Sequence, residues 1–116
     1  MKIQPHRHED DRRILWEWNK DIPMKRCKAI TTKGNVVLGK HYHNKTDSIF
    51  FILKGKGLCM LSDLKGKILL REWMFEGDCK FVPAGVVHTF ELREDTILLE
   101  AASEIYDPQD EIQVTE

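Results

Sequence analysis

The sequence Gly-Lys-His-Tyr-His at residues 39–43, together with Gly-Asp-Cys-Lys-Phe-Val-Pro-Ala-Gly-Val-Val-His at residues 77–88, decides the fold of this chain. His41 and His43 are two residues apart, and on an extended strand such side chains point to the same face of a sheet. His88 follows a Gly-x5-Pro-x-Gly turn, which ends one strand and directs the next. Three imidazoles that converge inside a β-barrel predict a metal site.

The composition bounds the class of protein. A chain of 116 residues forms one domain with a real core. Its net charge of −1, with Lys and Arg interspersed among acids, argues against nucleic acid as a partner. No apolar run approaches the roughly 18 residues of a membrane span, and the N-terminus has no apolar stretch typical of a signal peptide. We therefore expect no membrane contact and a cytoplasmic location.

The three cysteines, Cys27, Cys59 and Cys79, are odd in number and widely spaced. This pattern fits neither a disulfide framework nor a structural zinc ribbon. We expect all three to be buried, unpaired thiols.

Short apolar or alternating segments are separated by turn signals about every 8–12 residues, and helical periodicity is almost absent. The expected strands lie at 13–18, 24–32, 36–43, 48–54, 58–61, 68–75, 87–92 and 96–102. This pattern predicts an antiparallel sandwich or barrel. We expect residues 103–111 to form a short helical turn and then fray.

The domain organisation has two parts, a polar arm or edge segment at residues 1–12 and a barrel with a short C-terminal tail at residues 13–116. The arm carries a second His-x-His pair, His6 and His8. A second metal site is conceivable there, but no apolar alternation flanks the pair to fix its backbone. We therefore expect both histidines to be dispensable for metal binding.

Residues 48–54 are apolar on both faces of the expected strand. Such a strand must be covered on both sides, by a second sheet or by a partner subunit. In so short a chain we expect another subunit, which predicts a homodimer with a two-fold contact. The tryptophans Trp16, Trp18 and Trp73 are expected in core or dimer contacts, or as platforms on which a sugar stacks.

The two histidine segments resemble the cupin superfamily. Its second motif, Gly-x5-Pro-x-Gly-x2-His, is matched by Gly77, Pro83, Gly85 and His88, with Leu92 in place of the usual terminal Asn. Its first motif, His-x-His-x3–4-Glu-x6-Gly, is matched by His41, His43 and Gly55. The resemblance implies an all-β fold, an antiparallel jelly-roll β-barrel in a single domain.

One position departs from the first motif. Ser48 stands where most metal cupins hold a glutamate ligand, and Asp47 comes one residue early. A shift of one residue turns a strand side chain to the opposite face. We expect Ser48 to face the cavity and Asp47 to face away, unless a bulge at residues 45–46 turns Asp47 inward as a fourth metal ligand.

A narrower resemblance covers most of the chain. The segments Asp10-Asp11-Arg12, Ile22-Pro23, Lys25-Arg26, Gly39-x-His41-x-His43 and Ala102–Asp110 look like the nucleotide-sugar ketoisomerases of the dTDP-4-keto-6-deoxyglucose type and other cupins of surface-polysaccharide pathways. Those enzymes are dimers that work without metal and move protons with the histidines of the barrel. The tyrosine that they carry after the Lys-Arg pair is replaced here by Cys27 and Lys28.

The chemistry of His41, His43 and His88 depends on whether a metal is bound. Three imidazoles suit a divalent transition metal (Fe, Mn, Ni, Zn or Cu) and leave open positions for a substrate. Such a metal polarises a carbonyl, or activates dioxygen if it is iron. Without metal, the same imidazoles suit general base catalysis near neutral pH.

Three classes of function stay open from the sequence. The first is an isomerase or epimerase that acts on a sugar or sugar nucleotide, as the narrower resemblance implies. The second is a mononuclear-metal dioxygenase or another metal cupin enzyme that acts on a small polar molecule. The third is a non-catalytic small-molecule-binding cupin. In all three classes the partner is a small molecule, and the pattern does not identify it.

Overall fold

The structure is a computed structural model that describes residues 2–114, whose strands form two five-stranded sheets and one two-stranded ribbon. The first sheet has the order β1 (Lys2–Ile3), β9 (Cys79–Val82), β6 (Ser48–Lys54), β11 (Ile97–Ala102) and β4 (Arg26–Thr31). The second has the order β12 (Ile112–Gln113), β5 (Val36–Tyr42), β10 (Val87–Leu92), β7 (Lys56–Ser62) and β8 (Ile68–Phe75). The ribbon pairs β2 (His6–Glu9) with β3 (Ile14–Glu17).

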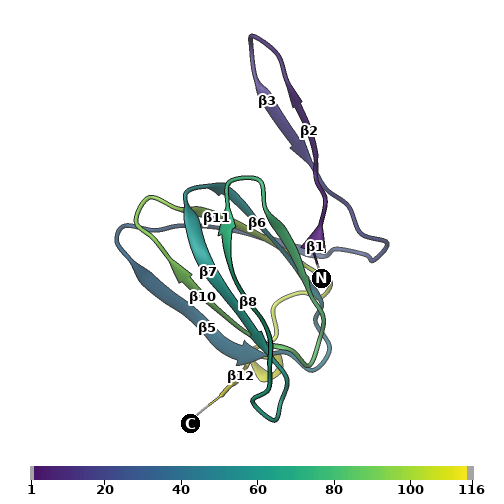
Figure 1. Cartoon of the computed structure of the whole chain (residues 1–116). Coiled ribbons are helices and arrows are strands. Elements are labelled where there is room, and N and C mark those ends of the chain that lie inside the picture. Colours follow the sequence, from purple (N-terminus) through teal and green to yellow (C-terminus); the bar gives the residue numbers. More distant parts are fainter. Residues whose placement is uncertain (1, 115–116) are drawn as a thin grey trace.

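All strand pairs in the described residues are antiparallel, and Figure 1 shows the two sheets wrapped around a common interior. The predicted all-β jelly roll is therefore confirmed. Within residues 2–114, no helix is both long enough and apolar enough to span a membrane.

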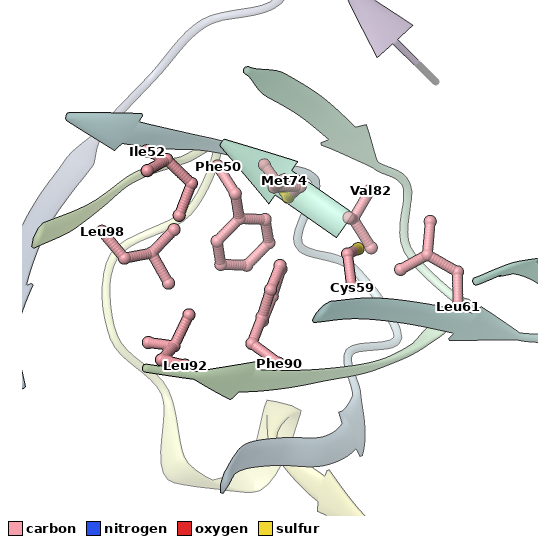
Figure 2. Close-up of a cluster of buried hydrophobic side chains, with 9 residues drawn as sticks. All are labelled: Phe50, Ile52, Cys59, Leu61, Met74, Val82, Phe90, Leu92 and Leu98. Atoms are coloured by element: carbon pink, nitrogen blue, oxygen red, sulfur yellow. The ribbon is translucent and has the colours of Figure 1, made fainter. Parts of the chain in front are cut away.

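The main core fills the space between the sheets. Its buried members are Phe50, Ile52, Cys59, Leu61, Met74, Val82, Phe90, Leu92 and Leu98 (Figure 2). Phe50 and Ile52 of β6 and Phe90 and Leu92 of β10 enter it at alternate positions, as the period 2 of a strand requires. The Phe50 and Phe90 rings lie 4.6 Å apart, and Phe50 also lies 5.4 Å from the ring of His88. Phe50 thus links the apolar core to the histidines.

The outer face of β6 is covered by the chain itself. Ile49 and Phe51 are buried there, and Trp16, Trp18 and Met24 pack against them. The Trp18 ring stacks on Phe51 at a centroid distance of 4.3 Å. The expectation that another subunit covers this face is wrong, because the segment before β4 folds back over the first sheet.

The two ends of the chain form short strands at the edges of the fold. The polar arm supplies the edge strand β1 and the strand β2, which carries the exposed His6 and His8. β2 pairs with β3, from the segment predicted as barrel, and the ribbon β2–β3 projects away from the barrel (Figure 1). The predicted short helical turn is the 3-10 helix η1 (Pro108–Asp110), but the tail does not fray after it, because β12 pairs with β5.

Of the three free cysteines, Cys59 and Cys79 are buried as expected. Burial raises the pKa of both thiols to about 12. Cys27 is exposed, so the expectation for it was wrong. The reason is that β4 lies at the edge of the first sheet, with one face open to solvent.

The stacking of Trp18 on Phe51 gives a first prediction. Trp18→Ala should lower the free energy of unfolding by about 2 kcal/mol, since it uncovers a fully buried phenylalanine. The control is Trp73→Ala, because Trp73 is 39% exposed on the outside of β8 and its loss should cost about 0.5 kcal/mol or less. Urea denaturation measures both, and equal losses would contradict the role given to Trp18.

Candidate functional site

The site depends on an irregularity in β5 that interrupts the alternation of inward and outward side chains. Leu38 packs against the main core, and His41, three residues later, also lines the interior. Strict alternation would turn His41 outward. Gly39 and Lys40 both have positive φ angles, of 97° and 58°, and the pairing of β5 with β10 shifts register between His88 and Thr89. This irregularity absorbs one residue and turns His41 inward.

Gly39 is required at this point by space as well as by its backbone angle. A Cβ atom on residue 39 would lie 2.5 Å from the carbonyl oxygen of His88. Because only glycine permits this approach, β5 and β10 bring His41 directly opposite His88 as paired residues.

The three predicted histidines form one cluster. One ring nitrogen from each of His41, His43 and His88 lies within 4.8 Å of the others. The Nε2 atoms of His41 and His88 are 3.1 Å apart, at hydrogen-bond distance. The His41 side chain is 16% exposed, whereas His43 and His88 are buried. His41 therefore faces the opening of the cavity.

His43 is fixed from the C-terminal end of the chain. Its Nδ1 donates to the carbonyl oxygen of Asp110 at 2.5 Å. This bond assigns the proton to Nδ1 and leaves Nε2 free to bind a metal or accept a proton. The Asp110 carboxylate in turn accepts hydrogen bonds from the amides of Asn44 and Lys45 and from the Thr46 hydroxyl, at 2.7, 3.1 and 2.6 Å.

The Asp110 carboxylate is buried, and burial raises its pKa. The hydrogen bonds from Thr46, Asn44 and Lys45 outweigh this effect and hold the pKa below its usual range. Asp110 is therefore an ionised anchor that joins η1 to the loop after β5. Sequence reasoning missed this role, because 66 residues separate Asp110 from Asn44.

His41 and His88 are kept neutral by their surroundings. Burial, together with His41 and His43 as potential positive charges, lowers the pKa of His88 to about 3. Burial also lowers the pKa of His41, although Glu111, 3.7 Å away, acts in the opposite direction. Neutral imidazoles are the form that binds metals and accepts protons.

The donor set fits a metal ion. Two imidazole nitrogens bound to one ion at the usual bond length lie roughly 3.0–3.4 Å apart, and the Nε2 atoms of His41 and His88 meet this condition. His88 Nδ1 is buried and has no hydrogen-bond partner in residues 2–114. The cluster of His41, His43 and His88 could therefore bind a metal, whose identity the nitrogens do not define.

Asp47 is directed elsewhere. Its Oδ1 accepts from the Ala84 amide at 2.9 Å, and its own amide donates to Ser103 Oγ, so the residue ties the loop before β6 to the turn after β9. Among the described residues, the metal-capable cluster contains neither Asp47 nor the arm histidines His6 and His8.

Ser48 is buried, and its hydroxyl donates to Glu100 Oε2 at 3.0 Å. A glutamate at position 48 would place a second carboxylate against Glu100. The structure therefore gives no support for a fourth metal ligand supplied by Ser48→Glu.

A cavity of about 200 Å³ opens between the sheets beside the histidines. Further polar residues that line it are Arg26, Lys28, Glu100, Tyr106, Asp107 and Glu111. None of these six was predicted as a site residue. The sequence could have indicated Glu100. It alternates with Leu98 and Ala102 on the inward face of β11, and an acidic residue is unusual at a buried position.

A small jelly roll with a histidine-lined cavity between its sheets defines a class of β-barrels with an interior site. Residues 17–112 match the protein family described as Cupin, and the chain belongs to that family. A protein of Aquifex aeolicus, described as uncharacterized, is 39% identical over 75 residues. The match spans 64% of this chain and 57% of that protein, so the chain matches little more than half of its relative's length.

Several solved structures share the fold. A 3,4-ketoisomerase from Helicobacter canadensis has a TM-score of 0.87 at 17% identity, covering 98% of this chain and 90% of its own. The sugar 3,4-ketoisomerase QdtA from Thermoanaerobacterium thermosaccharolyticum, in complex with TDP, has a TM-score of 0.82 at 20% identity, covering 98% and 87%. The RmlC epimerase of Mycobacterium tuberculosis has a TM-score of 0.83 at 18% identity, covering 97% and 67%. At these identities the similarity shows the fold alone.

The histidine cluster gives a second prediction. Replacing His41, His43 or His88 with Ala should abolish stoichiometric metal binding, because each supplies one of three converging nitrogens. Elemental analysis of protein purified without an affinity tag measures this. Deletion of residues 1–9, which removes His6 and His8, is the control and should leave the metal content unchanged. Equal metal in wild type and His88→Ala would contradict a single site.

The position of Asp47 gives a third prediction. Asp47→Ala should leave metal affinity nearly unchanged but lower the free energy of unfolding by about 1 kcal/mol, since the Ala84 amide loses its acceptor. Metal titration and urea denaturation of the same variant separate the two effects. A tenfold loss of metal affinity, about 1.4 kcal/mol, would show that Asp47 is a ligand after all.

The low pKa of His88 gives a fourth prediction, for metal-free protein in a chelator. Below the ordinary pKa of histidine, the unfolded chain binds a proton on His88 that the folded chain excludes. The free energy of unfolding should therefore fall as the pH drops from about 6.5 toward 3.

Urea denaturation across this pH range measures the effect. His88→Gln should lose part of the slope, and His6→Gln, on the exposed ribbon, should keep it. An identical slope in wild type and His88→Gln would be the contrary result.

Proposed function

We propose that this cupin is an isomerase or epimerase that moves protons on a keto sugar carried by a nucleotide. The observation that carries the proposal is the pair of neutral imidazoles, His41 and His88, whose Nε2 atoms lie 3.1 Å apart in a cavity that Arg26 and Lys28 also line. A carbon next to a carbonyl loses a proton to a neutral imidazole at physiological pH, and the cavity keeps that imidazole unprotonated.

His41 is the imidazole best suited to accept this proton. It is the most exposed of the three, and Glu111 lies 3.7 Å from its Nε2, where a carboxylate stabilises the imidazolium that forms. His43 is oriented by Asp110, and His88 holds His41 in place through the contact between their Nε2 atoms. If the three histidines instead hold a divalent transition metal (Fe, Mn, Ni, Zn or Cu), His41 is a ligand and not the base, and the metal would supply polarisation of the sugar carbonyl.

The cavity contains two cations that suit the phosphates of a nucleotide. Arg26 and Lys28 line it from β4, and the Arg26 guanidinium lies 5.7 Å from the centre of the Tyr106 ring. Arg26 Nε is buried without a hydrogen-bond partner in residues 2–114, so it has a donor to offer to a phosphate oxygen. The proposal is also supported by two structures of the 3,4-ketoisomerase QdtA, one in complex with TDP and one, of a mutant, in complex with TDP-4-keto-6-deoxyglucose.

A second candidate is a mononuclear-metal enzyme, such as a dioxygenase that acts on a small polar substrate. The observation that favours it is the convergence of three histidine nitrogens within 4.8 Å. Consumption of dioxygen by the iron-loaded protein, dependent on added substrate, would identify this class.

Calorimetry with TDP and turnover of TDP-4-keto-6-deoxyglucose, followed by nuclear magnetic resonance, test the proposal. We expect TDP to bind and the sugar to be converted. Arg26→Gln should weaken TDP binding about tenfold. The matched control, Arg93→Gln, removes an arginine that contacts Trp73 on the outside of the second sheet and should bind TDP normally. Absence of both binding and turnover would refute the proposal, and binding without turnover would favour a non-catalytic cupin.

We further propose that the chain is a homodimer. The reason is no longer the cover of the outer face of β6, which the chain itself supplies, but the exposed ribbon β2–β3. The ribbon β2–β3 projects from the barrel (Figure 1), and Ile14 on it is 49% exposed. An isolated two-stranded ribbon is only marginally stable in water, so a second copy that packs against it would stabilise it. The cytoplasmic location stays a prediction.

The homodimer is the fifth prediction. Sedimentation at micromolar concentration should give about twice the monomer mass of 13.6 kDa. Deletion of residues 1–12, which removes β2, should shift the protein toward monomer. A wild-type monomer at this concentration would contradict the proposal.

A further inference from the structure

The first sheet also contributes an ionisable side chain to the cavity. Glu100 on β11 lines the cavity and is only 7% exposed. Its Oε1 lies 3.1 Å from Lys28 Nζ, and its Oε2 accepts from the Ser48 hydroxyl at 3.0 Å. His41 and His88 belong to the second sheet. The cavity therefore has imidazoles on one sheet and a carboxylate on the other.

A structural role explains Glu100 poorly. Burying a carboxylate is costly, and an ion pair seldom recovers that cost in full. Lys28 needs no such partner, because its side chain is 47% exposed to solvent. The neighbours of Glu100 on the inward face of β11, Leu98 and Ala102, are buried and apolar. An apolar residue at position 100 would pack there at a lower cost, so the carboxylate has another use.

The register of the sheet holds this carboxylate in place. Glu100 is paired with Lys28 across β11 and β4, while Ser48 lies on β6 on the other side of β11. Ser48 occupies the position at which the first cupin motif has glutamate. The cavity thus keeps a carboxylate near that position, but the carboxylate comes from β11 and is held by the serine that replaces the motif residue.

We propose that Glu100 is a catalytic residue that carries a proton between two oxygens of the sugar, so that the reaction is a shift of the keto group to the neighbouring carbon. The inference rests on the proposed function and specifies which reaction takes place, a keto shift and not an epimerisation. Such a shift moves two protons, one between carbons and one between oxygens. The carbon proton leaves perpendicular to the plane of the developing double bond and the hydroxyl proton leaves close to that plane, so two carriers in different directions serve the reaction.

The steps balance without an oxidant. His41 takes the proton from the hydroxyl-bearing carbon, the freed electron pair forms a carbon–carbon double bond, and the carbonyl electrons move to the former keto oxygen. Glu100 takes the hydroxyl proton and gives it to that oxygen. The oxygen left negative forms the new carbonyl, and the neighbouring carbon takes the proton back from His41.

The experiment incubates TDP-4-keto-6-deoxyglucose with each protein in deuterium oxide and measures two quantities by nuclear magnetic resonance. One is deuterium incorporation at carbon next to the carbonyl, and the other is formation of the shifted ketone. Glu100→Gln should keep deuterium incorporation within about threefold of wild type but lose about 10²–10⁴-fold in keto shift. Glu91→Gln, which alters an exposed glutamate on β10, is the matched control and should change neither quantity.

Further variants keep the test decisive if Glu100→Gln folds poorly. Glu100→Asp retains a carboxylate and should recover part of the keto shift. Ser48 is a positioning residue, because its hydroxyl holds the Glu100 carboxylate. Ser48→Ala should therefore slow the keto shift and leave deuterium incorporation intact. Ser48→Thr, which keeps a hydroxyl, should restore the rate of the keto shift.

The outcomes separate the two proposals. If wild type shifts the ketone and Glu100→Gln does so at the same rate, the assignment of Glu100 is overturned and the proposed function stands. Equal loss of deuterium incorporation and keto shift in Glu100→Gln also overturns the assignment. If wild type inverts a carbon without moving the ketone, the epimerase form of the function stands and the assignment fails. If wild type does neither, the proposed function fails and the assignment fails with it.

Discussion

The close approach of β5 and β10 at Gly39 is the constraint on which the site depends. The backbone there passes so near the His88 carbonyl that a side chain on residue 39 would be excluded. Because the same irregularity changes the phase of β5, Leu38 can contribute to the core while His41 faces the cavity. Core and site thus share one strand, and a single backbone adjustment separates them.

Electrostatics divides the cavity into two walls with different properties. On the second sheet, burial and mutual proximity keep the imidazoles of His41 and His88 neutral. On the first sheet, Glu100 is buried beside the ammonium of Lys28. A substrate between the sheets meets a proton acceptor on one side and a hydrogen-bonding carboxylate on the other.

The fold and the three histidines could be predicted from the sequence because both depend on the spacing of residues that lie close together in the chain. The Gly-x5-Pro-x-Gly turn and the His-x-His pair each span few residues, and period-2 alternation identified most strands. Asp110 and Glu100 were missed because their roles depend on contacts between residues more than fifty positions apart. The cover of Phe51 was misjudged for the same reason, since nothing in the segment from Trp16 to Met24 indicates where it folds back.

The bond from His43 to Asp110 has a consequence for the order in which the protein matures. It joins residues 67 positions apart, and its acceptor lies in the last turn before β12. A nascent chain that has completed β11 already possesses every strand of the main core, but His43 still lacks its anchor. The barrel strands can therefore all be synthesised before the site is complete, and the growing polypeptide lacks an oriented His43 until Asp110 has emerged.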